Sequence, residues 1–319
     1  MTKVEQINST IFCIDCHDLQ RKNRTGSYIL KGKKSTLIET SASPSIPYIL
    51  SGLEQLEVNL ETIEHIIVTH IHLDHAGGAG LLLEKCPNAD LIVHPKGARH
   101  LVDPSRLIAG ARAVYGDDFD SLFNPILAIP KERIKIVEHG EELILEDRKL
   151  TFYHTPGHAN HHISIHDSLS NGIFTGDTTG IHYQELDQNQ ISLILPSTSP
   201  SQFNPEAMLQ SVSLIEQIDP SIIYFGHYGH SSKPNEMYKQ IRYWLPIFIE
   251  CGEKAMISCE DTNERVQLTS ELLLNEIKKY LPDGEVENNT ALKEILDLDL
   301  QVSSMGIIDT LIKNSSRNR

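Results

Sequence analysis

The chain has 319 residues, of which 39% are hydrophobic and 22% charged, and its formal net charge is −15. This length and composition are typical of one large or two ordinary globular domains with a sizeable core. An acidic chain offers no evident source for the counterion release that drives nucleic-acid binding, and anionic lipid repels it. We therefore expect neither nucleic acid nor a membrane as a partner.

The cysteine pattern indicates a reducing compartment. Five cysteines occur without regular spacing, and the first ten residues are polar and lack the pattern of a signal peptide. The sequence therefore predicts reduced thiols and a cytoplasmic protein. Residues 13–17 match the C-x-x-C-H pattern of haem attachment, but they begin inside a predicted strand, and we interpret the match as coincidence.

The N-terminal part of the chain is predicted to form strands and one helix. Strands are expected at residues 11–15, 26–31 and 35–39, separated by polar turns. A helix near residues 45–56 follows, for which Ser45 is a suitable N-cap. This opening predicts an antiparallel start to a sheet.

The densest group of potential metal ligands follows a short apolar strand predicted at residues 63–68. The segment from residue 68 to residue 80 reads VTHIHLDHAGGAG, with three imidazoles and one carboxylate within six residues. Side chains alternate along an extended segment, so His70, His72 and Asp74 can point the same way. His75 then begins a predicted helix. Imidazole and carboxylate groups are the ligands that suit Zn²⁺ and similar divalent ions.

Three further candidate ligands each follow the end of a predicted strand. Strands near residues 149–153, 172–175 and 221–225 precede His158, Asp177 and His227, respectively. Because strand ends can meet at one rim of a sheet, this common placement predicts that the ligands come together. Residues 96–130 and the long irregular segment 180–205 are expected to contribute walls of the site.

The pattern changes beyond residue 234. Apolar residues recur at helical spacing and predict helices at residues 235–249, 262–281 and 292–313. We therefore divide the chain into a catalytic domain of residues 1–245 and a helical C-terminal region of residues 246–319. Two interpretations of that region stay open, a lid over the site or a packing or dimer interface.

Four elements together resemble the signature of the metallo-β-lactamase superfamily. They are HxHxDH at residues 70–75, TPGH at 155–158, FTGD at 174–177 and the pair Gly226-His227. The resemblance covers roughly residues 9–230 and implies an α/β fold, a four-layer αβ/βα sandwich. It also implies seven metal ligands: His70, His72 and His158 for a first ion, Asp74, His75 and His227 for a second, and Asp177 as the bridge.

The resemblance implies an enzyme, a hydrolase with two divalent ions per chain. Its nucleophile would be a hydroxide that both ions share. Asp74 and Asp177 are the candidate catalytic carboxylates, and His162 and His230 are candidates to orient metal-bound groups. Zinc is the expected metal, and manganese and iron accept the same ligands. In the superfamily the segment after the third strand often approaches the metal site, so residues from Glu39 onward are minor candidates.

The substrate is less well defined by the sequence. Residues 178–183 read TTGIHY, where glyoxalase II carries Cys-Gly-Arg, and no lysine or arginine lies within the ligand motifs. We therefore expect a small molecule, an ester, lactone or thioester. A phosphodiesterase with the same site and a non-hydrolytic iron or metal-binding protein stay open, as does a homodimer. Deleting residues 260–319 is expected to leave the metal content of soluble protein unchanged.

Overall fold

The computed structural model describes residues 2–317, which form two compact units. Each unit is built from several segments of the chain. The first comprises Met1–Thr155, His161–Gly176 and Asp219–Pro234, and the second comprises Pro156–Asn160, Asp177–Ile218 and Asn235–Arg319.

The first unit contains a seven-stranded sheet whose spatial order follows the sequence. Its first four strands pair antiparallel and its last four pair parallel, so β4 is where the direction changes. The predicted strands at residues 11–15, 26–31 and 35–39 are all present, and one short strand precedes them. The strands are β1 (Val4–Gln6), β2 (Ile11–Asp15), β3 (Gly26–Leu30), β4 (Ser35–Ile38), β5 (Ile63–Ile67), β6 (Asp90–Val93) and β7 (Ile134–Ile136).

A six-stranded sheet also belongs to the first unit, in the order β15-β14-β11-β10-β9-β8. Only β11 and β14 pair parallel. The carboxyl ends of these two strands therefore lie at the same edge of the sheet. The strands are β8 (Glu142–Ile144), β9 (Lys149–His154), β10 (Ile163–Asp167), β11 (Gly172–Gly176), β14 (Ile222–Phe225) and β15 (His230–Ser231).

A buried cluster joins the two sheets. It includes Tyr28 from the first sheet and Phe152, Phe174 and Tyr224 from the second. The rings of Tyr28 and Phe174 meet edge to face with centroids 5.2 Å apart. The Tyr28 hydroxyl lies 2.6 Å from the carbonyl oxygen of Phe225, so its polar end is also satisfied across the sheets. The two sheets therefore pack face to face as a sandwich.

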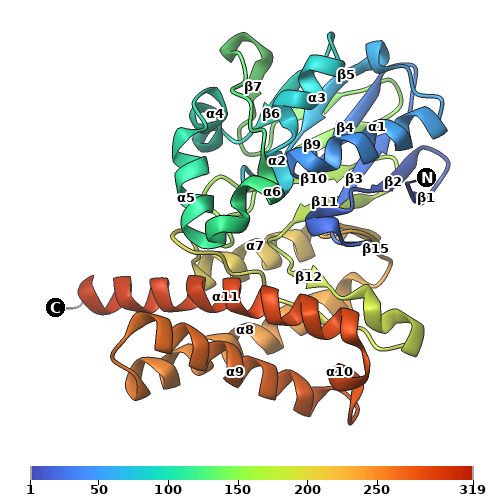
Figure 1. The fold of residues 1–319 in the computed structure, drawn as a ribbon. Coiled ribbons are helices and arrows are strands. Elements are labelled where there is room, and N and C mark those ends of the chain that lie inside the picture. Colours follow the sequence, from blue (N-terminus) through green and yellow to red (C-terminus); the bar gives the residue numbers. More distant parts are fainter. Residues whose placement is uncertain (1, 318–319) are drawn as a thin grey trace. The chain divides into compact units, whose positions relative to one another are not determined.

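Helices cover the other face of the first sheet (Figure 1). Ile49 and Leu53 of α1 and Leu82 of α3 are fully buried against strand residues such as Ile29 and Ile66. Burying each such side chain contributes about 1.5–3 kcal/mol. The helices of this unit are α1 (Ile46–Gln55), α2 (Leu73–Ala76), α3 (Ala79–Lys85), α4 (Pro95–Val102), α5 (Ser105–Tyr115) and α6 (Phe119–Phe123).

The second unit is mainly helical. Its helices α8, α9 and α11 lie side by side (Figure 1) and share a buried cluster that includes Trp244, Phe248, Leu273 and Leu296. The predicted helices are confirmed, and the predicted boundary at residue 245 falls inside α8. Whether residues 246–319 are a separate domain stays a prediction. The elements are β12 (Ile181–His182), β13 (Ile194–Leu195), α7 (Pro205–Ile218), α8 (Pro234–Ser258), α9 (Thr262–Tyr280), α10 (Glu285–Asn288) and α11 (Thr290–Arg317).

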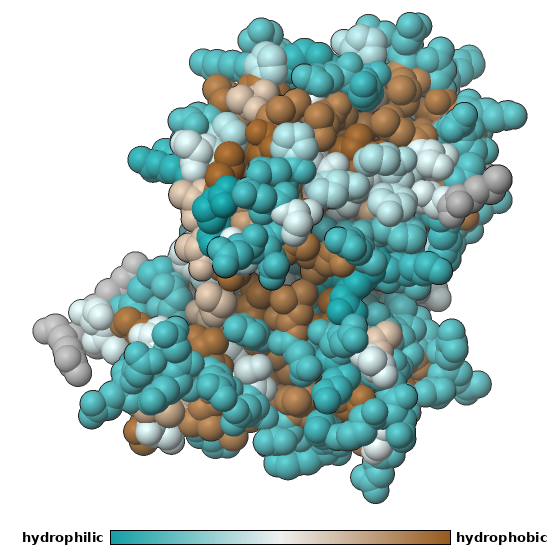
Figure 2. Space-filling model, in the orientation of Figure 1, coloured by the Kyte–Doolittle hydropathy of each residue, from teal (hydrophilic) through white to brown (hydrophobic). Residues whose placement is uncertain are grey.

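Hydrophilic side chains cover much of the face drawn in Figure 2, and hydrophobic side chains are also visible on it. Exposed large apolar residues are scattered, among them Ile144 and Ile257. Among residues 2–317, no helix combines the length and apolar character that crossing a membrane requires.

A buried histidine at the end of the first sheet links stability to pH. His94 caps α4, because its Nδ1 accepts from the Lys96 N–H at 3.0 Å, and its ring lies against that of His154 with centroids 4.2 Å apart. Burial, and next the neighbouring His154, lower the pKa of His94 from 6.5 to about 4. The unfolded chain then binds more protons between these two values. The stabilisation by neutral His94 is therefore complete above pH 6.5 and is lost as the pH falls towards about 4.

We expect His94→Asn to reduce the loss of stability between pH 7.5 and pH 5. Asparagine retains an acceptor for the cap and does not titrate. The measurement is urea unfolding of both proteins in the presence of a chelator, so that metal loss at acid pH does not contribute. An equal loss of unfolding free energy in both proteins would contradict this assignment.

Candidate metal centre

The histidines that follow β5 form one cluster in the first unit. The chain leaves the strand at Ile67, stays extended at His72 and enters α2 at Leu73. His70 and His75 are buried, and His72 is half-buried. The ring of His70 lies with its centroid 4.6 Å from that of His72 and 4.1 Å from that of His75. The predicted convergence of these three imidazoles is therefore present in the structure.

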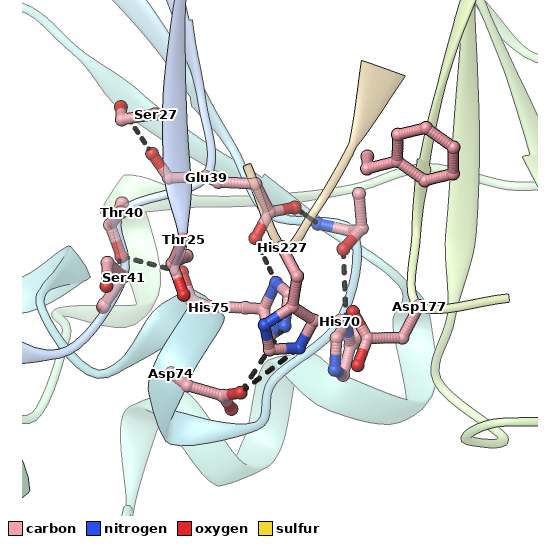
Figure 3. Close-up of polar contacts among 12 residues, drawn as sticks. Thr25, Ser27, Glu39, Thr40, Ser41, His70, Asp74, His75, Asp177 and His227 are labelled. Carbon is pink, nitrogen blue, oxygen red and sulfur yellow. Dashed lines mark hydrogen bonds and ion pairs between the residues drawn. The ribbon is translucent and has the colours of Figure 1, made fainter. Parts of the chain in front are cut away.

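Asp74, His75 and His227 form a group able to hold a metal ion. One ligand atom from each lies within 4.8 Å of the other two. Asp74 Oδ2 is 3.6 Å from His75 Nε2 and 3.7 Å from His227 Nε2 (Figure 3). His227 reaches this group because it comes two residues after the end of β14 at Phe225. Two imidazole nitrogens and a carboxylate oxygen form a donor set that fits Zn²⁺ and related ions.

The carboxylate of Glu39 orients the His75 ring through Nδ1, the ring nitrogen that does not face Asp74. Its Oε2 lies 2.8 Å from His75 Nδ1, and its Oε1 accepts from the Thr69 N–H at 2.8 Å (Figure 3). The residue is 1% exposed and has a φ of 71°, with its carbonyl oxygen bonded by the Ser27 hydroxyl at 2.7 Å. A carboxylate that accepts from Nδ1 leaves Nε2 as the ligand atom. Glu39, a minor candidate from sequence, is thus a main partner of the site.

His162 lies beside the cluster, while His230 has a partner elsewhere. The Thr155 hydroxyl is 2.8 Å from His162 Nδ1, and the His162 ring centroid is 5.2 Å from that of His70. A Cβ on Gly176 would come within 2.5 Å of His162 Nε2, so the chain there requires glycine. His230 Nδ1 lies 3.7 Å from a carboxylate oxygen of Glu5. The role of both histidines in orienting ligands stays a prediction.

Asp18 is a buried acid that the sequence analysis did not single out. It is 2% exposed and accepts from the Thr25 hydroxyl at 3.2 Å. Burial, and next the negative charge of Asp74, raise the pKa of Asp18 from 3.8 to about 6, although Arg24 and His227 act in the opposite direction. Its position in the loop between β2 and β3 carries no local pattern, so no sequence signal would have identified it.

The two remaining candidate ligands belong to the second unit and share a partner there. His158 Nε2 lies 3.6 Å from Asp177 Oδ2. His158 Nδ1 is 2.9 Å from the carbonyl oxygen of Ser197, and the Ser197 hydroxyl donates to Asp177 Oδ2 at 3.0 Å. Both ligands are 2% exposed. The predicted nearness of His158 and Asp177 is therefore present within that unit.

The fold and these clusters define a sandwich protein with residues able to hold a metal ion. The family model of the metallo-beta-lactamase superfamily matches residues 24–227, more than half of the chain. The chain belongs to this superfamily, whose members are mostly hydrolases and typically bind two metal ions. The predicted fold class, with two sheets and a helical C-terminal region, is confirmed.

Individual relatives agree with this assignment. The metallo-beta-lactamase fold-containing protein ST1585 of Sulfurisphaera tokodaii is 25% identical over 222 residues, which cover 68% of this chain and 77% of that protein. The crystal structure of ST1585 matches with a TM-score of 0.67 at 21% identity, covering 93% of this chain and 98% of that chain. The family protein TTHA1429 of Thermus thermophilus matches with a TM-score of 0.67 at 14% identity over 97% and 95% of the two chains.

Two matches to proteins of named activity are shorter. A hydroxyacylglutathione hydrolase of Buchnera aphidicola is 25% identical over 126 residues, 40% of this chain and 37% of that protein. A rubredoxin-oxygen oxidoreductase of Megalodesulfovibrio gigas is 24% identical over 129 residues, 40% of this chain and 26% of that protein.

Proposed function

We propose that the protein is a dinuclear metal-dependent hydrolase of a small ester, lactone or thioester. The observation that carries this proposal is the group of Asp74, His75 and His227, whose ligand atoms converge while Glu39 holds the far side of His75. A buried carboxylate behind a histidine is the usual arrangement for a metal ligand. A structural histidine pair would have no need of a second carboxylate on its other nitrogen.

All seven ligand positions of the superfamily pattern are filled, which supports two ions. We assign His70, His72 and His158 to the first ion, Asp74, His75 and His227 to the second, and Asp177 to both. The family model covers all seven positions. Zinc is the metal we propose, with manganese and iron as alternatives. When bound, the ions would supply Lewis acidity and an activated water for hydrolysis.

The residues of the chain prepare this chemistry. Glu39 keeps a proton on Nδ1 of His75 and so directs Nε2 towards Asp74 and His227. The Ser197 carbonyl does the same for His158, because a carbonyl only accepts. Asp74 is half-buried and is our candidate to exchange a proton with the leaving group, and Asp177 is our candidate bridge.

An ester, lactone or thioester is favoured because the ligand motifs contain no lysine or arginine. The match to a hydroxyacylglutathione hydrolase keeps a thioester among the candidates, although residues 178–183 lack the Cys-Gly-Arg of glyoxalase II. We further propose a cytoplasmic enzyme that acts on a small molecule and binds neither nucleic acid nor membranes, on the basis of cysteine usage and charge. A homodimer is an open alternative to a monomer.

Two other functions each have one supporting observation. Arg24 lowers the pKa of Asp18 by its positive charge. Asp74 and His227 also shift the pKa of Asp18, so Arg24 belongs to the surroundings of these two candidate ligands. A guanidinium in that neighbourhood would suit the phosphate of a phosphodiester. The match to a rubredoxin-oxygen oxidoreductase supports the non-hydrolytic alternative.

We expect about two metal ions per chain at saturation and about one in His227→Ala. Loss of His227 removes one ligand of the second ion and none proposed for the first. The measurement is elemental analysis of both proteins after equilibration with excess zinc and removal of loosely bound ions. A wild-type protein that never exceeds one ion per chain would contradict the dinuclear assignment.

The function is tested with a substrate panel on metal-replete protein. We expect hydrolysis of short uncharged aryl esters, lactones or thioesters to exceed that of bis-aryl phosphodiesters at equal concentration. His227→Ala, measured alongside, separates metal-dependent turnover from contaminating esterase. Dominant phosphodiester turnover would favour the phosphodiesterase, and bound iron with no hydrolysis would favour the oxidoreductase.

A further inference from the structure

We propose that the C-terminal helix α11 positions the metal ligands His158 and Asp177 through the segment Ser197–Ser199. The proposal rests on the proposed function, because it assigns both residues to the metal centre. All the residues involved belong to the second unit. It gives the helical C-terminal region a role at the site that neither a lid nor a dimer interface would have.

Ser197 contacts both ligands. Its carbonyl oxygen lies 2.9 Å from His158 Nδ1, and its hydroxyl donates to Asp177 Oδ2 at 3.0 Å. A carbonyl only accepts, so His158 carries its proton on Nδ1 and presents the lone pair of Nε2. The hydroxyl holds one oxygen of Asp177 in a fixed orientation. A displacement of Ser197 would therefore move or release two ligands together.

The next two residues are held by α11. The Thr198 hydroxyl donates to the carbonyl oxygen of Ser303 at 2.8 Å. A Cβ on Gly306 would lie 2.6 Å from the Thr198 oxygen and 2.7 Å from the carbonyl carbon of Ser199. The helix backbone thus lies directly against the segment, and only glycine at position 306 permits this approach.

The same helix holds the chain further along. The Ser201 N–H donates to Asp309 Oδ2 at 3.2 Å, and the Thr310 hydroxyl donates to the carbonyl oxygen of Phe203 at 3.0 Å. Residues 196–203 contain no helix or strand of their own. Contacts from successive turns of α11 therefore replace the regular structure that would otherwise fix this segment.

The test compares two glycine-to-alanine variants. One glycine lies on α11 and the other lies on α8, where it faces α11. Gly306→Ala forces a Cβ against the backbone of Thr198 and Ser199, which has to move. Gly252→Ala is the matched control, because its Cβ would meet side-chain atoms of Ile307, the nearest at 2.4 Å, and so crowds α11 without contacting the segment. Thr198→Val is a third variant, close in shape to the wild-type residue, that removes only the bond to Ser303.

The probe is Co²⁺, whose visible absorption reports ligand geometry. Gly306→Ala and Thr198→Val should both displace Ser197, the partner of both ligands, without removing it. We therefore expect them to lower Co²⁺ affinity by about 10-fold, the lower end of the effect of losing such a partner, and to change the spectrum. Gly252→Ala should keep the wild-type affinity and spectrum even if its melting temperature falls.

Among the results with the variants, two would overturn the proposal. One is a wild-type Co²⁺ spectrum and affinity in Thr198→Val. This result would decide against the proposal even if Gly306→Ala failed to fold. The other is an equal effect of Gly252→Ala and Gly306→Ala, which would indicate general destabilisation. Failure of the proposed function alone is distinguishable, because wild-type protein would then bind Co²⁺ without hydrolysing the substrate panel. Absence of Co²⁺ binding would overturn both.

Discussion

Asp177→Ala is expected to lower turnover more than about 100-fold, beyond the range seen when a mere partner of a ligand is lost. Asp177 is 2% exposed, and its Oδ2 lies 3.6 Å from His158 Nε2. The same oxygen accepts a hydrogen bond from the Ser197 hydroxyl. As the proposed bridge, Asp177 is a ligand of both ions, so its loss removes one ligand from each. Loss of His227 removes a ligand from one ion only. Steady-state kinetics and metal content of the variant are the measurements.

The fold of Asp177→Ala is expected to survive. Asp177 comes directly after β11 and is not a member of the hydrophobic clusters. Asp297→Ala is the matched control, because it removes the same charge from an exposed position of α11 in the same unit. Its turnover should equal that of the wild type. A fully active Asp177→Ala enzyme would contradict the bridging role.

Local patterns explain why much of the fold could be predicted. The strand that precedes the ligand motif was predicted at residues 63–68 and occurs at Ile63–Ile67, because a β-branched run bounded by polar residues has few alternatives. The ligands of the first unit were predictable for the same reason. Their place after strand ends brings them together. The alternation predicted for Asp74 is wrong, because α2 begins at Leu73 and Asp74 therefore lies on a helix and not on an extended segment.

Features that depend on distant contacts could not be predicted. Glu39 stands out only once its carboxylate is seen beside His75, which lies 36 residues further along the chain. Asp18 has no periodic pattern around it, and its burial arises from tertiary packing. The contact of Thr198 with Ser303 spans 105 residues. No spacing rule in the sequence connects two such segments.

The contact between Thr198 and Ser303 changes what we expect of a protein that lacks the C-terminal helices. The sequence led us to expect that deleting residues 260–319 leaves the metal content unchanged, because all seven ligands precede that point. If α11 positions His158 and Asp177 as proposed, the deletion also removes the support of two ligands. A truncated protein that stays soluble should then bind metal more weakly than the full chain.

Glu39→Ala is expected to lower metal affinity about 10- to 100-fold, the usual effect of losing a carboxylate partner of a ligand histidine. Glu39 Oε2 lies 2.8 Å from His75 Nδ1, and Oε1 accepts from the Thr69 N–H at 2.8 Å. Its loss removes the acceptor that two buried groups use, at a cost of about 1–3 kcal/mol of unfolding free energy in the metal-free protein. Competition with a chelator measures the affinity, and urea unfolding measures the stability.

Glu39→Gln removes only part of what Glu39→Ala removes, because the amide side chain keeps the volume of glutamate and one acceptor oxygen. That oxygen can serve either the Thr69 N–H or His75 Nδ1, but not both as the carboxylate does. We therefore expect metal affinity and stability between those of the wild type and Glu39→Ala. Glu54→Ala, at an exposed position of α1, controls for the loss of one negative charge and should match the wild type in both measurements. If Glu39→Ala binds metal as tightly as Glu54→Ala, then Glu39 does not orient His75 for the ion, and its two hydrogen bonds serve the fold alone.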